Sequence, residues 1–209
     1  MPPESTVFVV DDDEAMRNSL RWLIESVKLP VKTYASSAEF LDAFEGMPGC
    51  LILDVRMPGM GGLDLQERLR EKSICLPIIF ISGHGDIPMA VHAMKAGAID
   101  FIEKPFNDQV LLDRIYYAIE LCKRMRKTRE AQFNIVANHR LLTPRECQVV
   151  EGVVAGKSNK VIASELGVSW KTIEVHRANA MHKMQAHSLS ELVGMVLHLR
   201  TILYPISRQ

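Results

Sequence analysis

Short apolar runs alternate with amphipathic stretches through the first 120 residues of this 209-residue chain. The runs have the length of strands and lie at residues 6–10, 31–34, 51–54, 78–82 and 99–103. Helical patterning is present near residues 14–28, 37–45, 63–71, 87–96 and 107–122. Because a strand that is buried on both faces reads as a continuous apolar run, these five repeats predict an α/β fold. We expect a five-stranded, doubly wound parallel sheet with helices on both faces.

A second, all-helical unit is predicted to begin near residue 141. Thr143 and Glu146 have the spacing of a capping box, and Pro144 fits the first position of a helix. Further helical patterns cover residues 159–166, 170–184 and 189–199. The first two of these flank a turn that contains Gly167, which is typical of a helix-turn-helix. The sequence therefore predicts an all-α, four-helix unit with a helix-turn-helix.

These patterns predict two domains, at residues 1–122 and 141–209. Residues 123–140 between them begin with a strongly basic stretch and contain no glycine or proline. This basic segment could extend the fifth helix or form a separate helical linker, and the sequence leaves both possibilities open.

The net charge of zero hides a division along the chain. Residues 1–120 carry 19 acidic and 11 basic side chains, a net charge of −8, whereas residues 121–209 carry 6 and 14, a net charge of +8. A basic half joined to an acidic half favours a nucleic-acid-binding module with a partner module of another function. Together with the helix-turn-helix pattern, this basic charge leads us to expect double-stranded DNA as a partner of the second domain.

Two classes of protein are disfavoured by the sequence. The apolar runs are too short to cross a membrane, and the first residues do not resemble a secretion signal, so we expect a cytoplasmic protein. The four cysteines form no Cys-x-x-Cys pair, which argues against a disulfide framework or a zinc knuckle.

Polar side chains follow the predicted strands at their carboxyl ends. Residues 11–13 are all aspartate and follow the first strand, Asp54 ends the third, Ser82 ends the fourth and Lys104 follows the fifth. Ligands bind beyond the carboxyl ends of parallel strands, where the connecting loops open a crevice. We therefore expect these side chains to share one site.

The chemistry of this predicted site favours phosphoryl transfer to a carboxylate. Adjacent carboxylates repel a nucleotide phosphate but suit a hard cation, so we expect Mg²⁺ as the cofactor. The expected ligands are Asp11, Asp12, Asp54 and the backbone carbonyl of Arg56. Once the cation offsets the negative charge, Asp54 can attack phosphorus, while Lys104 and Ser82 stabilise the phosphoryl oxygens. The product would be an aspartyl phosphate.

The segments VVDDDEAMR, LDVRMPGMGG and ISGHGDIPMAVHAMKAGAIDFIEKPF occur in this order and resemble the receiver domain of two-component response regulators. The resemblance covers residues 5–122 and implies a flavodoxin-like fold, with a sensor histidine kinase as the phosphoryl donor. It matches the metal-binding acids Asp11 and Asp12, the phospho-acceptor Asp54, the switch residues Ser82 and Phe101, and the phosphate-binding Lys104. Arg56 and His84 match positions that tune hydrolysis in the family, or they are plain exposed side chains.

The predicted helix at residues 170–184 would be the DNA-recognition helix. If Ile173, Ala180 and Met184 face the core, an outward stripe is left for base contacts, and neighbouring basic side chains are available for phosphates. The candidates for base contacts on this stripe are Lys171, Glu174, Val175 and Ala178. The candidates for phosphate contacts are Lys171, Arg177 and Lys183, together with Ser158, Asn159 and Lys160 at the start of the preceding helix.

The segment from LTPRECQ to SLSELV resembles the LuxR-type DNA-binding domain over residues 140–198. Together with the receiver-like half, it resembles the FixJ branch of the NarL/FixJ response regulators. The resemblance places Lys171, Glu174, Val175, Ala178 and Asn179 at base-facing positions. Glu174 is a departure from relatives that carry lysine there; a carboxylate can accept from cytosine but repels phosphate. We expect homodimerisation on phosphorylation and contact with RNA polymerase. The apolar stripe of the last helix either dimerises on DNA or only closes the small core.

Two other functions compete with a phosphorylation-controlled transcription regulator. A DNA-binding protein with an inactive receiver is disfavoured, because the acids, the hydroxyl and the lysine are all present. An Mg²⁺-dependent phosphatase that turns over at Asp54 is disfavoured because Val55 and Arg56 follow, so the Asp-x-Asp motif is missing. We therefore expect a regulator rather than an enzyme.

Overall fold

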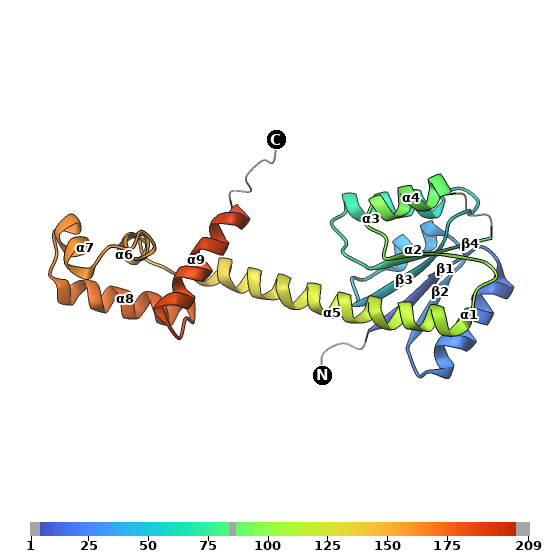
Figure 1. Ribbon diagram of the computed structural model, residues 1–209, viewed down its shortest axis with the longest axis horizontal. Helices are drawn as coiled ribbons and strands as arrows, with labels where there is room; N and C mark the ends of the chain where they lie inside the picture. The colour runs from blue at the N-terminus through green and yellow to red at the C-terminus, as the bar shows by residue number, and fades with distance from the viewer. Residues whose placement is uncertain (1–4, 84–86, 204–209) are drawn as a thin grey trace. The chain divides into compact units, whose positions relative to one another are not determined.

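The computed structural model describes residues 5–83 and 87–203. The chain divides into two compact units, Met1–Arg126 and Lys127–Gln209, each with its own hydrophobic core (Figure 1). The division falls inside the basic segment 123–140 and within a single helix, α5 (Asp108–His139). Of the two alternatives for this segment, the structure has an extension of the fifth helix.

The first unit is a parallel sheet with helices on both faces. The strands are β1 (Thr6–Val10), β2 (Val31–Tyr34), β3 (Gly49–Asp54), β4 (Ile78–Ser82) and β5 (Asp100–Glu103), in the order β2-β1-β3-β4-β5. The helices are α1 (Glu14–Ser26), α2 (Ser37–Ala43), α3 (Gly62–Glu71), α4 (Ile87–Lys95) and the first part of α5. Within the described residues, this confirms the predicted five-stranded, doubly wound α/β fold.

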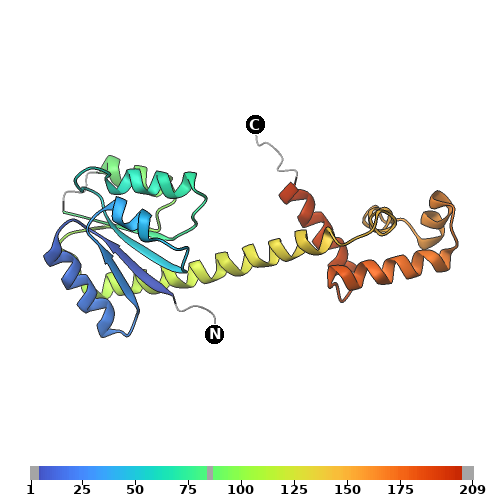
Figure 2. The same cartoon turned by 180° about the vertical axis from the view of Figure 1, so that it is seen from behind.

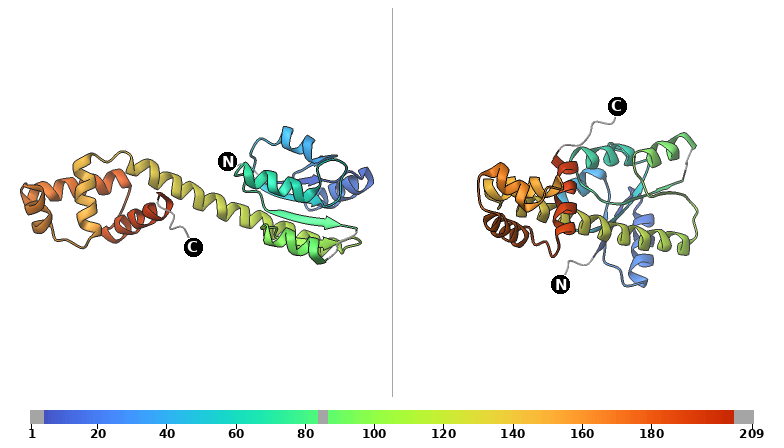
Figure 3. Two further views of the ribbon diagram at one scale, coloured as in Figure 1. Left: turned by 90° about the horizontal axis from the view of Figure 1, so that it is seen from above. Right: turned by 60° about the vertical axis from the view of Figure 1, so that its left-hand side comes forward.

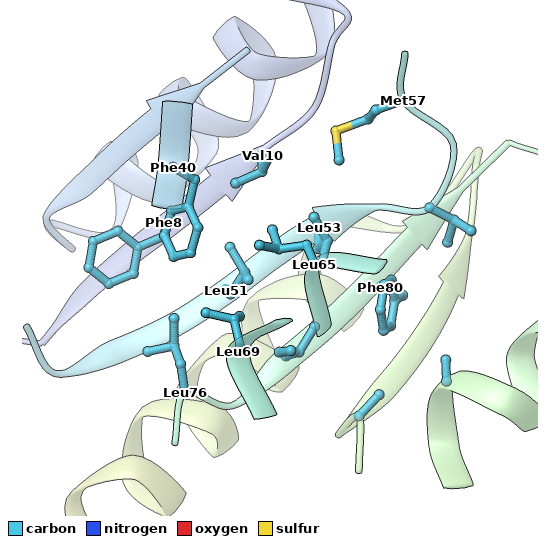
Figure 4. Close-up of a cluster of buried hydrophobic side chains, with 14 of the residues drawn as sticks. Phe8, Val10, Phe40, Leu51, Leu53, Met57, Leu65, Leu69, Leu76 and Phe80 are labelled. Carbon is cyan, nitrogen blue, oxygen red and sulfur yellow. The ribbon is translucent and has the colours of Figure 1, made fainter. Parts of the chain in front are cut away.

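Alternate residues of each strand enter two different cores, as the pleat of a strand requires. Phe8, Leu51 and Phe80 pack with side chains of α2, α3 and α4 on one face of the sheet (Figure 4). Val9 and Ile52 pack with α1 and α5 on the other face. Figures 1 and 2 show α3 and α4 on the side of the sheet opposite α1 and α5. Burial on both faces explains why the strands are continuous apolar runs.

The strand order places the carboxyl ends of β1 and β3 at a topological switch point. From β1 the chain continues to β2 on one side and then returns to β3 on the other, so the two connections diverge. Asp11 follows β1 and Asp54 ends β3, so both carboxylates lie at this divergence. Gly62, the first residue of α3, lies directly against the end of β3. A Cβ at this position would be 2.2 Å from the carbonyl oxygen of Asp54, so only glycine fits.

The second unit contains the predicted four helices, which Figure 3 shows from two directions. They are α6 (Pro144–Val154), α7 (Asn159–Leu166), α8 (Trp170–Met184) and α9 (Leu189–Leu203). Thr143 and Glu146 form the expected capping box, and Gly167 has φ +68° in the turn between α7 and α8. These features confirm the helix-turn-helix expected from the sequence.

The end of α5 belongs to the second unit. Ile135 packs against the core formed by α6, α8 and α9, and Asn138 Nδ2 donates to the carbonyl of Met184 at 3.5 Å. The sequence did not show this packing, because the basic start of the segment dominates its composition. In the part of the chain that the structure describes, no helix has the combination of length and apolarity needed to cross a bilayer.

Candidate functional site

Three of the predicted site residues meet at the carboxyl end of the sheet. Lys104 Nζ donates to Asp11 Oδ2 and to Asp54 Oδ1, and both distances are 2.8 Å. The three side chains come from the ends of β1, β3 and β5, so they meet only because the strand order brings these ends together. The other oxygen of Asp54, Oδ2, accepts the backbone N–H of Arg56 at 2.8 Å. Asp54 is therefore held at both oxygens.

Burial sets the electrostatics of this triad. Asp11 is 1% exposed and Asp54 is 7% exposed. Burial raises the pKa of Asp11, and hydrogen bonds from Lys104 and the Asp13 amide offset only part of this effect. Burial alone would lower the pKa of Lys104, but the hydrogen bonds to Asp11 and Asp54 outweigh it and raise the pKa. Lys104 therefore stays an ammonium ion between the two carboxyl groups.

The remaining predicted residues of this site lie around the triad. Ser82 ends β4 and is buried, and its carbonyl accepts the backbone N–H of Lys104 at 2.8 Å. Phe101 in β5 is half-buried, with its ring centroid 6.2 Å from that of Phe80. The side chain of Arg56 is exposed. His84 lies outside the described residues.

The three predicted metal acids are not all brought together. Asp12 is exposed, whereas its neighbour Asp11 is buried. Among residues 5–83 and 87–203, no three His, Cys, Asp or Glu side chains converge on a single point. Asp13, the third aspartate of this run, is exposed but has a structural role, since its Oδ1 accepts from the amide of Ala15 at 2.9 Å and caps α1.

The second candidate site is the outer face of α8. Ile173, Ala180 and Met184 are buried, as expected for the inward side of this helix. The opposite side presents the predicted base-facing residues Lys171, Glu174, Val175, Ala178 and Asn179, all of them exposed. At the start of α7, Ser158 and Lys160 are also exposed, and Ser158 caps the helix through the amide of Val161.

Two of the predicted phosphate-binding side chains have partners within the unit. Lys183 Nζ lies 2.7 Å from Oε2 of Glu146, the buried acid of the capping box. Arg177 Nη1 donates to Oδ1 of Asn159 at 3.3 Å, which links α8 to the start of α7. The sequence could not show the pair between Lys183 and Glu146, because the two residues lie 37 positions apart.

An open pocket of about 500 Å³ lies between the starts of α7 and α8. It is lined by residues 157–160 and by Trp170, Glu174 and Arg177. Lys157 and Trp170 were not predicted as site residues. Lys157 lies in the loop before α7 and pairs with Glu165 at 2.7 Å. Trp170 is the first residue of α8. The sequence did not indicate it as a site residue, because a single aromatic residue usually lies in the core.

Comparison with protein families assigns both halves of the chain. The family described as response regulator receiver domain matches residues 7–116. The family described as bacterial regulatory proteins, luxR family, matches residues 140–196.

Relatives of known function match nearly the whole chain. The transcriptional regulatory protein FixJ of Bradyrhizobium diazoefficiens is 46% identical over 198 residues, which covers 94% of this chain and 97% of the relative. The response regulator protein TodT of Pseudomonas putida is 45% identical over 197 residues, covering 94% of this chain and 87% of the relative.

Solved structures of response regulators also match most of this chain. The response regulator StyR matches with a TM-score of 0.85 at 46% identity, covering 93% of this chain and 99% of the StyR chain. Full-length FixJ from B. japonicum matches with a TM-score of 0.58 at 46% identity, covering 94% and 98%. The chain therefore belongs to the NarL/FixJ family of two-component response regulators, with a receiver domain followed by a LuxR-type DNA-binding domain.

Proposed function

We propose that Asp54 accepts a phosphoryl group from a sensor histidine kinase, and that this modification controls DNA binding by the second unit. The observation that carries the proposal is the position of Lys104 Nζ, 2.8 Å from both Asp11 and Asp54. An ammonium ion held beside a nearly buried carboxylate can also bind the oxygens of a phosphoryl group that is transferred to that carboxylate.

In the proposed step, an oxygen of Asp54 forms a bond to phosphorus while the bond between phosphorus and the kinase histidine breaks. The histidine nitrogen leaves with the electron pair. The amide of Arg56 holds Oδ2 of Asp54 and so fixes the orientation of the nucleophile. Lys104 and the hydroxyl of Ser82 stabilise the charge on the phosphoryl oxygens. Ser82 suits this role because it ends the strand next to the one that Asp54 ends.

Charge at the triad supports Mg²⁺ as a cofactor. Two carboxylates against the single ammonium of Lys104 give the triad a net charge of −1, and the exposed Asp12 lies next to it in the chain. All the available donors are oxygens, which a hard divalent cation prefers. Asp11, Asp54 and the backbone carbonyl of Arg56 would hold the ion, and Asp12, which does not converge with the other two acids in the structure, would have to turn toward it. When bound, Mg²⁺ supplies positive charge that offsets the carboxylates and the phosphoryl oxygens.

The proposed switch runs through β4 and β5. Ser82 ends β4, and its carbonyl accepts the amide of Lys104, so the two strand ends are joined beside Asp54. Phe101 lies on β5, is half-buried and packs near Phe80. We propose that movement of Ser82 toward the phosphoryl group draws Phe101 further inward. This change would alter the surface of the first unit and favour a homodimer.

The second unit is proposed to bind double-stranded DNA through α8 and to contact RNA polymerase from the same promoter. The exposed stripe that includes Lys171, Glu174 and Val175 supports placement of this helix in the major groove. Arg177 and the start of α7 lie beside it and supply donors for phosphates. Lys183 already pairs with Glu146, so we propose that its main role is to stabilise the unit.

The phosphorylation proposal is tested by incubating the chain with acetyl phosphate and Mg²⁺ and measuring its intact mass. One added phosphate is expected, and Asp54→Asn should abolish it because the amide cannot form the acyl phosphate. Asp13→Asn is the matched control, since it makes the same substitution at an exposed residue that caps α1. Full labelling of Asp54→Asn, or loss of labelling in the Asp13 control alone, would overturn the assignment.

A further inference from the structure

Trp170 is the feature of the second unit that neither core packing nor the proposed contacts explain. It is the first residue of α8 and is 50% exposed. Neither hydrophobic cluster of the second unit includes it, although both draw side chains from α8. Single exposed apolar side chains are common, so exposure by itself would mean little. The surroundings of this indole are what distinguish it.

The ring of Trp170 lies in a basic, donor-rich setting. It lines the pocket between α7 and α8 together with Lys160 and Arg177. Lys171 Nζ is 5.9 Å from the centre of the ring, which is a cation–π distance. Within the described residues, the indole nitrogen donates no hydrogen bond. A buried or partly covered indole usually finds an acceptor for its N–H, so this donor is available to an acceptor from outside the chain.

The charge of the pocket indicates what kind of ligand it would bind. Its lining has three basic side chains, Lys157, Lys160 and Arg177, and one acid, Glu174. Lys157 is paired with Glu165, whereas Arg177 binds the neutral amide of Asn159 and keeps its charge uncompensated there. Positive charge, N–H donors and an aromatic face together suit a sugar–phosphate backbone.

We propose that Trp170 contacts the DNA backbone directly: its indole N–H donates to a phosphate oxygen, and its ring packs on the adjoining deoxyribose. Lys171 stays over the ring and binds a neighbouring phosphate. This contact fixes how α8 lies in the groove, because it acts at the first residue of the helix. The inference rests on the proposed DNA binding and assigns a backbone contact to a residue outside the predicted set.

The chain contains two tryptophans, so one substitution makes Trp170 the sole reporter. Trp22, in α1 of the first unit, is 78% exposed and has no part in the proposed sites. The full-length Trp22→Phe chain, treated with acetyl phosphate and Mg²⁺, is titrated with a short mixed-sequence duplex at low salt. Anisotropy of a dye on the duplex measures binding. Trp170 emission and its quenching by acrylamide measure the contact.

The emission of Trp170 should change in step with the anisotropy, and acrylamide quenching should fall because the ring becomes covered. Trp170→Ala should weaken binding about tenfold, the size expected for loss of a hydrogen bond to a charged acceptor. Trp170→Phe keeps a ring but loses the N–H, so its affinity should lie between. Neither variant should change the salt dependence, whereas Lys171→Ala should reduce the logarithmic salt slope by about one. Unchanged helix content by circular dichroism would show that both Trp170 variants fold.

The outcomes separate this inference from the proposed function. If anisotropy reports binding while the emission and quenching of Trp170 stay constant, the DNA contact is wrong and DNA binding stands. If anisotropy shows no binding in any condition, the proposed function fails and the inference fails with it. If purified RNA polymerase protects Trp170 from acrylamide and the duplex does not, the residue contacts protein, and the DNA assignment is overturned.

Discussion

At the scale of single residues, Lys104 holds together two carboxylates that would otherwise repel each other inside the protein. Asp11 and Asp54 each accept from its ammonium group at 2.8 Å. Removing one partner from a largely buried ionic cluster leaves uncompensated charge, which costs more than the cluster itself contributes. Lys104 is therefore expected to matter for stability as well as for phosphoryl transfer.

Lys104→Met tests this structural role. The free energy of unfolding at neutral pH should fall by about 3 kcal/mol in the absence of divalent cations. Mg²⁺ should restore more stability to this variant than to the parent chain, because it supplies the missing positive charge. Urea unfolding with and without Mg²⁺ measures both effects. Lys95→Met, at an exposed position of α4, is the control; equal loss in both variants would contradict the prediction.

Glu146 gives the second unit a dependence on pH. Burial by itself would raise the pKa of Glu146, but hydrogen bonds from Lys183 and Thr143 outweigh it and lower the pKa below the usual value of a glutamate. A carboxyl group whose pKa is lowered by folding stabilises the folded state above its unfolded pKa. That stabilisation is lost as the pH falls through the lower, folded value.

We therefore expect the second unit to lose stability below about pH 4.5, beyond what exposed acids would cause. In Glu146→Gln this part of the pH dependence should disappear, with a lower stability at neutral pH. Thermal unfolding of the Trp22→Phe chain, followed by Trp170 emission, reports on the second unit. If the Glu146→Gln variant lost as much stability at low pH as the parent chain, Glu146 would not be the cause of this pH dependence.

The residues of the triad could be predicted from the sequence, whereas their contacts could not. Asp11, Asp54 and Lys104 each follow or end an apolar run, and the topology of a parallel sheet brings such positions together. The exposure of Asp12 beside the buried Asp11 depends on the local path of the loop. The sequence singled out both Lys183 and Glu146, but it did not indicate their ion pair, because the two residues lie on different helices.

At the scale of elements, α8 has a lysine at its start and an exposed acid one turn later. Lys171 and Glu174 are both exposed on the stripe proposed to face DNA. A carboxylate there lowers affinity for any phosphate and accepts only from base amino groups. We therefore expect α8 to bind DNA of any sequence less tightly but to discriminate better between base sequences.

Glu174→Lys should increase affinity for a mixed-sequence duplex and steepen the logarithmic salt slope by about one, because a lysine there would neutralise one more phosphate. Anisotropy titrations over a range of salt concentrations provide the measurement. Glu174→Gln removes the charge without adding a cation, so it should change the slope less. An unchanged slope in Glu174→Lys would place this side chain away from the DNA.

The helix α5 shows which parts of an element a sequence can predict. Its start was predicted from amphipathic spacing, and its first part packs on the sheet through Leu111 and Ile115. Beyond residue 122 the pattern weakens into a basic stretch, and composition alone fits an extension and a separate helix equally. The structure has one continuous helix up to His139, and Ile135 near its end packs against the second core, a tertiary contact that composition does not indicate.

Ile135→Ala should destabilise the second unit by about 1–2 kcal/mol, because the side chain is only partly buried in its core. Phe133→Ala, two residues earlier on the same helix, is the matched control, since Phe133 is 71% exposed. Denaturant unfolding followed by Trp170 emission in the Trp22→Phe background compares the two. Equal effects of both substitutions would mean that the end of α5 is not part of the second unit.

At the scale of the whole molecule, the folds of both units could be predicted because short-range sequence patterns indicate each of them. Continuous apolar runs indicate strands that are covered on both faces, and the Thr143–Glu146 spacing marks where the second set of helices begins. The charge difference between the halves agrees with one unit for signalling chemistry and one for DNA. The proposed homodimer would depend on surfaces that phosphorylation alters, and no local sequence pattern indicates such a change.

Phosphorylation is expected to convert the chain from monomers to dimers and to increase its affinity for DNA. The physical reason is the proposed movement of Ser82 and Phe101, which alters the surface of the first unit. Sedimentation velocity before and after treatment with acetyl phosphate and Mg²⁺ measures the oligomeric state, with Asp54→Asn as the unlabelled control. The same sedimentation coefficient for the labelled and unlabelled chain would contradict a switch based on dimers.

Gly62 has a consequence for how variation in such a chain should be interpreted. Every amino-acid replacement open to a glycine codon adds a Cβ, and here that atom would overlap the carbonyl oxygen of Asp54, at 2.2 Å. We therefore expect substitutions of Gly62 to be rejected during evolution, although glycine has no side chain that could take part in phosphoryl transfer. A catalogue of tolerated mutations would score Gly62 as strictly as Asp54, and the reason would be steric exclusion rather than chemistry.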